Sequence, residues 1–71
     1  MSDFAKIRLL AMIDNEIEEV TGAISNNRLW MHGSDTMEDA AMFQENITEL
    51  EEYKGTLFEL RKQIYGGKID V

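Results

Sequence analysis

The stretch NNRLWMHGSDTMEDAA, residues 26–41, holds the only Trp and the only His of the chain, together with its densest group of turn and cap residues. Gly33 can end a helix, because glycine readily adopts the left-handed conformation that often follows a helix C-terminus. Just beyond it, Asp35 and Glu38 have the spacing of a capping box, and Ser34 is a competing cap. We therefore interpret this stretch as a bend between two helices, with a turn at 32–35.

On the N-terminal side of the bend, apolar side chains recur at alternating spacings of three and four residues, the period of one helix face. Ser2 or Asp3 can cap the start of this helix, and Asp3 also suits the positive end of the helix dipole. The sequence predicts a first helix over about 3–31. Its apolar face consists of Leu10, Ile13, Ile17, Val20 and Ile24, and Phe4 and Ile7 extend it toward the N-terminus.

On the C-terminal side, a second apolar face repeats at intervals of seven residues, which predicts a helix over about 36–65. Gly66 and Gly67 can end this helix in the way proposed for Gly33. Residues 67–71 are expected to form a flexible tail. The face consists of Phe43, Leu50, Leu57 and Ile64, with Ile47, Tyr53 and Leu60 between them.

A link this short forces the two helices to lie antiparallel, so residues 1–66 are predicted to form one all-α hairpin. With the bend at Gly33 and Ser34, residues whose numbers sum to about 68 should face each other. Ile24 would then meet Phe43, and the two apolar faces would match along their whole length. The expected pairs also include Val20 with Ile47, Ile17 with Leu50, Leu10 with Leu57, and Phe4 with Ile64.

Both apolar faces are wider than a single partner helix can cover, since Leu9, Met12 and Met42 lie beside the main rows. The sequence therefore predicts a homo-oligomer, most simply a twofold dimer that forms a four-helix bundle. Gly22 and Gly55 interrupt the helices at a cost of about 1 kcal/mol each relative to Ala. They are read as tolerated sequence variation, as places of close packing, or as a kink.

The composition argues against several classes of function. The chain has no Cys, so disulfides and thiolate metal sites are excluded, and it carries 14 acids against 7 bases for a net charge of −7. Such a charge argues against direct binding to nucleic acid or to an anionic membrane. No apolar run is long enough to span a bilayer and no secretion signal is recognised, so a cytoplasmic protein is expected.

The function that the sequence favours is that of a small, acidic, non-enzymatic interaction protein, acting as an adaptor, regulator or inhibitor. Besides its own second copy, we expect another protein, of basic character, as the partner. The acidic part of the partner surface would consist of Asp14, Glu18, Glu49 and Glu52, and its apolar anchor of Arg28, Trp30 and Met31. The acids could also be only a solvated outer face, and Trp30 could instead be buried as a cap on the hairpin end.

Two alternatives remain open at this point. The first is an oligomer that sequesters or senses a small ligand or nucleotide, with a pocket between subunits. Its ligand-binding groups would be Arg28, His32, Tyr53, Lys54 and Arg61. The second is a carboxylate metal-binding bundle, although the Glu-x-x-His pairs of di-iron bundles are missing. No metal ligand, cofactor or catalytic residue is assigned from the sequence.

Overall fold

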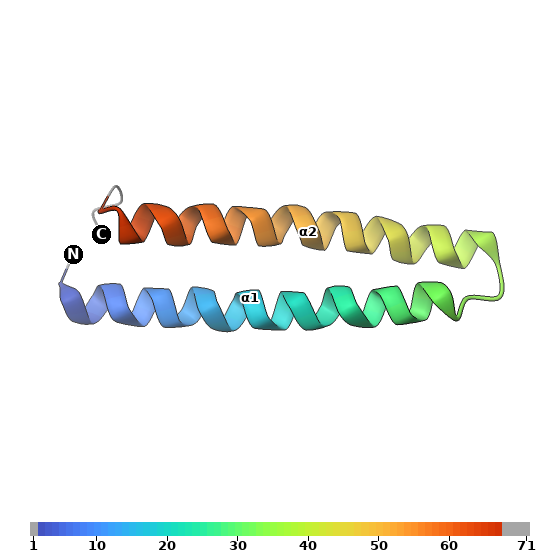
Figure 1. The fold of residues 1–71 in the computed structure, drawn as a ribbon, viewed down its shortest axis with the longest axis horizontal. Coiled ribbons are helices and arrows are strands. Elements are labelled where there is room, and N and C mark those ends of the chain that lie inside the picture. Colours follow the sequence, from blue (N-terminus) through green and yellow to red (C-terminus); the bar gives the residue numbers. More distant parts are fainter. Residues whose placement is uncertain (1, 68–71) are drawn as a thin grey trace.

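The computed structural model describes residues 2–67 as a two-helix hairpin (Figure 1). Helix α1 spans Asp3–His32 and helix α2 spans Met37–Tyr65. The helices lie side by side and antiparallel, with the start of α1 and the end of α2 at the same end of a rod about 51 Å long. The predicted all-α antiparallel hairpin is confirmed. The prediction of a flexible tail concerns, apart from Gly67, residues outside the described range.

Both helices begin at a hydroxyl cap. In α1 the Ser2 hydroxyl oxygen accepts a hydrogen bond from the Ala5 backbone N–H at 3.2 Å. Ser2 is one of the two cap residues that the sequence predicted. In α2 the cap is Thr36, whose Oγ1 accepts from the Asp39 N–H at 3.1 Å. The predicted cap at Asp35, or at Ser34, is therefore wrong by one or two residues. The Ser34 hydroxyl instead donates back to a carbonyl of α1, so it helps to end the first helix.

The role predicted for Gly33 is also wrong. Its φ is −88°, so it does not adopt the left-handed conformation, and its N–H donates to the Leu29 carbonyl at 3.0 Å as a further helical bond. Among the described residues, the one positive φ belongs to Gly67, at +69°. A left-handed glycine therefore follows α2 but not α1.

The core is a thin seam between the helices. Its best buried side chains are Ile47, which is 3% exposed, and Val20, which is 4% exposed. Yet no side chain in the described part of the chain is completely buried, because each helix has only one neighbour. The buried set is Ile13, Val20, Ile24, Ile47, Leu57 and Ile64, and the half-buried side chains packed against it are Leu9, Leu10, Ile17, Met31 and Leu50.

The register of the hairpin differs from the expected one by more than a helical turn. Phe43 contacts Trp30 rather than Ile24, and Asn46 bonds Asn27 across the seam. The link 33–36 causes the difference, because Thr36 is extended and α2 begins beyond the end of α1 (Figure 1). At the other end α1 overhangs α2. Phe4 is therefore 74% exposed there and is not part of the core beside Ile64.

Among residues 2–67, one polar residue, Asn27, is buried in the seam. Its Nδ2 donates to the Ala23 carbonyl at 2.8 Å, and its Oδ1 accepts from Nδ2 of Asn46 at 3.3 Å. A buried amide without partners would be costly, so this bond favours the register in which the two Asn residues meet. It is a link between the helices that the apolar pattern did not reveal.

Candidate interaction surfaces

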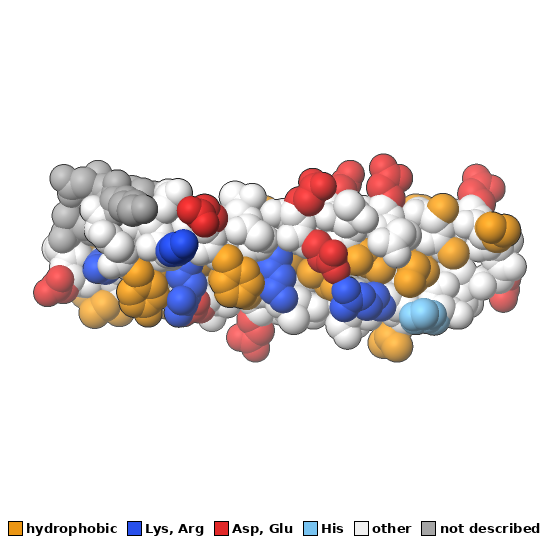
Figure 2. Space-filling model, turned by 45° about the horizontal axis from the view of Figure 1, so that its top comes forward, with side chains coloured by type: hydrophobic (Ala, Val, Ile, Leu, Met, Phe, Trp, Pro, Cys, Tyr) orange, Lys and Arg blue, Asp and Glu red, His pale blue; other side chains and the backbone are white. Residues whose placement is uncertain are grey.

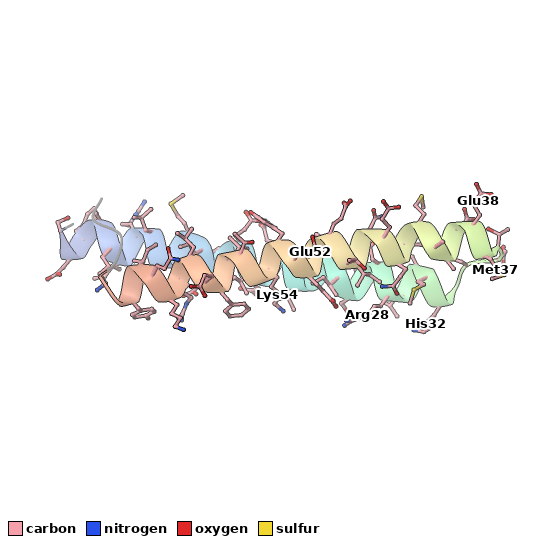
Figure 3. All side chains as sticks on the ribbon, turned by 90° about the horizontal axis from the view of Figure 1, so that it is seen from above. Arg28, His32, Met37, Glu38, Glu52 and Lys54 are labelled. Atoms are coloured by element: carbon pink, nitrogen blue, oxygen red, sulfur yellow. The ribbon has the colours of Figure 1, made fainter. Side chains whose placement is uncertain are left out.

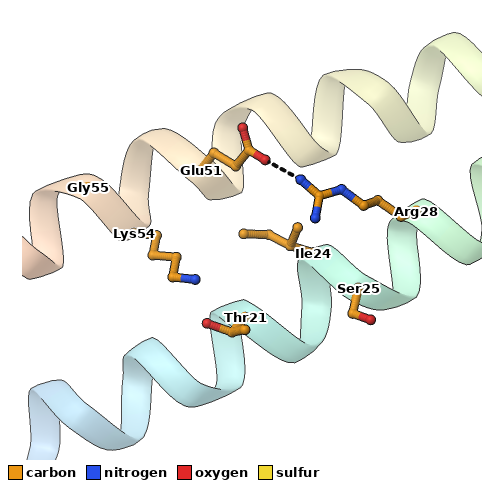
Figure 4. Close-up of a pocket in the computed structure, with 7 residues that line it drawn as sticks. All are labelled: Thr21, Ile24, Ser25, Arg28, Glu51, Lys54 and Gly55. Atoms are coloured by element: carbon orange, nitrogen blue, oxygen red, sulfur yellow. Dashed lines mark hydrogen bonds and ion pairs between the residues drawn. The ribbon is translucent and has the colours of Figure 1, made fainter.

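On one face of the seam, polar side chains of both helices surround a shallow cavity of about 410 Å³ (Figure 4). Arg28 of α1 bonds Glu51 of α2 at 2.7 Å, and Lys54 lies on the other side of the cavity. Both side chains of the ion pair are about half exposed, so it contributes only about 0.2–1 kcal/mol. The remaining lining residues are Thr21, Ile24, Ser25 and Gly55.

The same face continues toward the termini as a row in which cations and aromatic rings alternate. The Lys54 ammonium lies 6.0 Å from the Phe58 ring centre, and the Arg61 guanidinium lies 4.8 Å from that of Tyr65. Arg61 also donates from Nε to the Asp14 carboxylate at 2.7 Å. This hydrogen bond raises the pKa of Arg61, against a smaller lowering by desolvation. Figure 2 shows the alternation of basic and hydrophobic side chains along this face.

The opposite face has an apolar groove, which we call the terminal groove, in the half of the rod near the termini. It has a volume of about 350 Å³, and most of its lining is apolar. The side chains that line it come from both helices. They are Leu9, Met12, Ile13 and Glu16 of α1 and Tyr53, Leu57, Leu60 and Ile64 of α2.

Near the bend, two aromatic rings pack together. The ring centres of Trp30 and Phe43 are 5.9 Å apart and the rings are tilted by 49°. Trp30 nevertheless remains 55% exposed, so it is not the buried cap that the sequence left as one reading. Met42, beside Phe43 in the chain, is also half exposed. We call Trp30, Met42 and Phe43 the aromatic knob.

The charge is divided unequally along the rod. Residues 19–52, the half near the bend, contain eight acids and one base. The described residues of the other half, 2–18 and 53–67, contain five acids and five bases. The half near the bend therefore carries the entire net charge of the molecule. Around the rod, Arg28 and Lys54 lie along one edge and Glu38 on the opposite one (Figure 3).

The four acids expected to form one partner surface are not brought together. Asp14 is paired with Arg61, so much of its charge is compensated. Glu49 lies across the seam from Asn27, beside Asn46 on α2. Glu18 and Glu52 are exposed and have no ion-pair partner among residues 2–67.

The predicted apolar anchor is likewise divided. Arg28 is held by Glu51 on the polar face, Met31 packs half-buried against the core, and Trp30 belongs to the aromatic knob. Of the alternative ligand-binding residues, only Arg28 and Lys54 line one cavity. The others lie apart. Tyr53 lines the terminal groove, Arg61 is paired with Asp14, and His32 ends α1.

Sequence reasoning missed the terminal groove and the two ion pairs between helices. The ion pairs depend on the register, which the apolar pattern placed more than a turn away. The side of the hairpin that carries the groove has a detectable signal, because the groove residues Met12 and Leu60 are separated by the same interval from Trp30 and Met42, respectively, two large apolar residues near the bend. That interval makes about five complete helical turns, so the members of each pair project from the same side of their helix.

Among residues 2–67, no group of three or more His, Asp or Glu side chains is arranged to hold a metal ion. Neither of the two described helices combines the length and the apolar character needed to cross a membrane. No protein-family model matches the chain, and no curated protein or solved structure matches it significantly.

Proposed function

We propose that this protein is a non-enzymatic interaction protein that works as a self-associated helical bundle and binds a basic protein through its acidic half. Self-association is supported by the area of the hairpin. Its solvent-accessible surface area is 5344 Å², whereas that of a compact monomer of 8.2 kDa is about 4500 Å². The excess is similar to the roughly 800 Å² that each partner buries in a standard interface.

The shape supports the same conclusion. The radius of gyration is 15.9 Å, compared with about 11 Å for a compact domain of this length. The side chains left exposed include large apolar ones that a second copy could cover, among them Trp30, Met12 and Leu60. A twofold dimer would convert two thin seams into the single core of a four-helix bundle.

The observation that carries the partner proposal is the concentration of all net charge in residues 19–52. Glu38, Glu45 and Glu52 follow one another at intervals of seven residues and are all exposed, so they form an acidic row on α2. A field of one sign steers an oppositely charged protein toward the surface and raises its association rate. A protein with a basic surface is therefore the partner that this half of the rod fits.

Neutralising the acidic row tests the partner proposal. Glu45→Gln with Glu52→Gln should weaken the complex with a basic protein captured from the source cells by about tenfold, because two exposed charge contacts are lost. The matched control is Asp3→Asn with Glu59→Gln, which removes two acids from the neutral half and should change affinity little. Affinity is measured by calorimetry at low and physiological salt. Equal weakening by both variants, or no dependence on salt, would contradict the proposal.

A second candidate function, the binding of a small anionic ligand, is favoured by the cavity that holds both Arg28 and Lys54. Glu51 neutralises Arg28, whereas the Lys54 ammonium has no ion-pair partner among residues 2–67. Gly55 leaves the cavity open, since no atom of α1 lies within 4 Å of the place where its Cβ would be.

This second candidate predicts that millimolar inorganic phosphate or a nucleotide raises the melting temperature of the protein, because a ligand of the folded state stabilises it by mass action. Lys54→Gln should abolish the rise, whereas Lys62→Gln should retain it. A melting temperature that no phosphate compound shifts would remove this candidate and leave the first one intact.

A further inference from the structure

The terminal groove and the aromatic knob are two parts of one face. On α1, Met12 belongs to the groove and Trp30 to the knob. On α2, Leu60 belongs to the groove and Met42 to the knob, and the number of residues between them is the same as on α1. The interval corresponds in each helix to about five turns and about 27 Å along the rod. The groove and the knob thus lie on the same side of the hairpin, one in each half.

These spacings define a common centre. Midway between Met12 and Trp30 is Thr21, and midway between Met42 and Leu60 is Glu51. Thr21 and Glu51 lie at nearly the same level of the rod, because facing residues such as Asn27 and Asn46, or Trp30 and Phe43, have numbers that sum to 73, and those of Thr21 and Glu51 sum to 72. One twofold axis perpendicular to the rod at this level would therefore relate the groove to the knob of a second copy in both helices at once.

That axis would bring the knob of one copy to the groove of the other. The groove residues of α1 surround position 12 or 13, and the axis carries this level to Trp30 of a second copy. The groove residues of α2 surround position 58 or 59, and the axis carries that level to Phe43. An aromatic side chain buries roughly 150–250 Å² when it is fully covered, and Trp30, which is 55% exposed in a single copy, still has about half of that area to bury in a dimer.

The charges favour the same orientation. A parallel dimer would place two halves of net charge −7 beside each other. An antiparallel dimer places each acidic half beside a neutral one, so the repulsion between copies is much smaller.

We infer that the occupant of the terminal groove is the Trp30–Phe43 knob of a second copy, in an antiparallel twofold dimer that buries both knobs. This inference rests on the proposed self-association and adds the orientation, the register and the residues in contact. The interface is closed, because each copy contributes one knob and one groove, so the assembly stops at two chains.

The single Trp provides the first test. Leu60 and Trp30 are roughly 25 Å apart along one chain, so an effect of Leu60 on the Trp30 environment has to come through a second copy. Leu60→Glu should convert a species of about twice 8.2 kDa in sedimentation into monomer, and should shift Trp30 fluorescence to longer wavelength. Phe58→Glu, on the other face, is the control and should change neither. Circular dichroism checks that both variants remain helical.

A second test measures the orientation directly. The chain has no Cys, so Asp35→Cys introduces a single site for a spin label at the bend. In the proposed dimer the two labels lie about 40 Å apart, whereas a parallel dimer places them within about 20 Å.

The outcomes separate this inference from the proposed self-association. A dimer with the long label distance and a Trp30 shift in Leu60→Glu supports the inference. A dimer with the short distance between spin labels, or one whose Trp30 emission is unchanged by Leu60→Glu, contradicts the inference but not the proposed self-association. A folded protein that sediments as a monomer at high micromolar concentration overturns both.

Discussion

Ile47→Asp is expected to unfold the hairpin. Ile47 is the best-buried side chain of the seam, and its replacement removes about 1.5–3 kcal/mol of apolar burial. The carboxylate would also leave water, at a cost of several kcal/mol. A domain of this length has a total stability of about 4–10 kcal/mol, so the two losses together are of similar size.

Far-ultraviolet circular dichroism measures the result, as a loss of most of the helical signal at room temperature. Met37→Asp is the matched control, since it places the same charge on the same helix at a side chain that is 90% exposed. Asp in the first turn of a helix is favourable, so this variant should stay folded. An unchanged spectrum for Ile47→Asp would show that Ile47 does not lie in the core.

Gly22→Ala together with Gly55→Ala is expected to stabilise the protein by about 2 kcal/mol, since each Gly costs about 1 kcal/mol relative to Ala inside a helix. Neither added Cβ would meet another atom within 4 Å, so the gain is not offset by a clash. This finding contradicts the reading in which these glycines permit close packing between the two helices of one hairpin. For a domain of this size the expected rise in melting temperature is roughly 8–16 °C.

Gly67→Ala is the control for this prediction, because the same substitution should act in the opposite direction there. Gly67 has a φ of +69°, a conformation that costs an L-residue roughly 1–2 kcal/mol. Thermal melts at one fixed protein concentration compare the variants, since self-association makes the melting temperature depend on concentration. A fall in the melting temperature of the double variant would mean that Gly22 or Gly55 has a packing role in the assembly.

Part of the candidate surface followed from local sequence. The exposure of Glu18 and Glu52 could be read from residue type and from position on a helix, whereas the sequence left open whether Trp30 is buried or exposed. The pairing of Arg28 with Glu51 and of Asp14 with Arg61 could not, because pairs between helices depend on register. Register here was set by the path of the link 33–36, whose extended residue at Thr36 carries α2 beyond the end of α1.

The sequence by itself determined that there are two helices, where they begin and end to within a residue or two, and that they fold back on each other. The reason is that helix period, caps and a short polar link are local properties. Only the tertiary structure decided which residues face each other, because an apolar row with near-heptad spacing packs almost equally well after a shift of a turn. The partly buried hydrogen bond between Asn27 and Asn46, and the geometry of the link, select one of those shifts. That choice places the terminal groove at one end of the face and the Trp30 knob at the other.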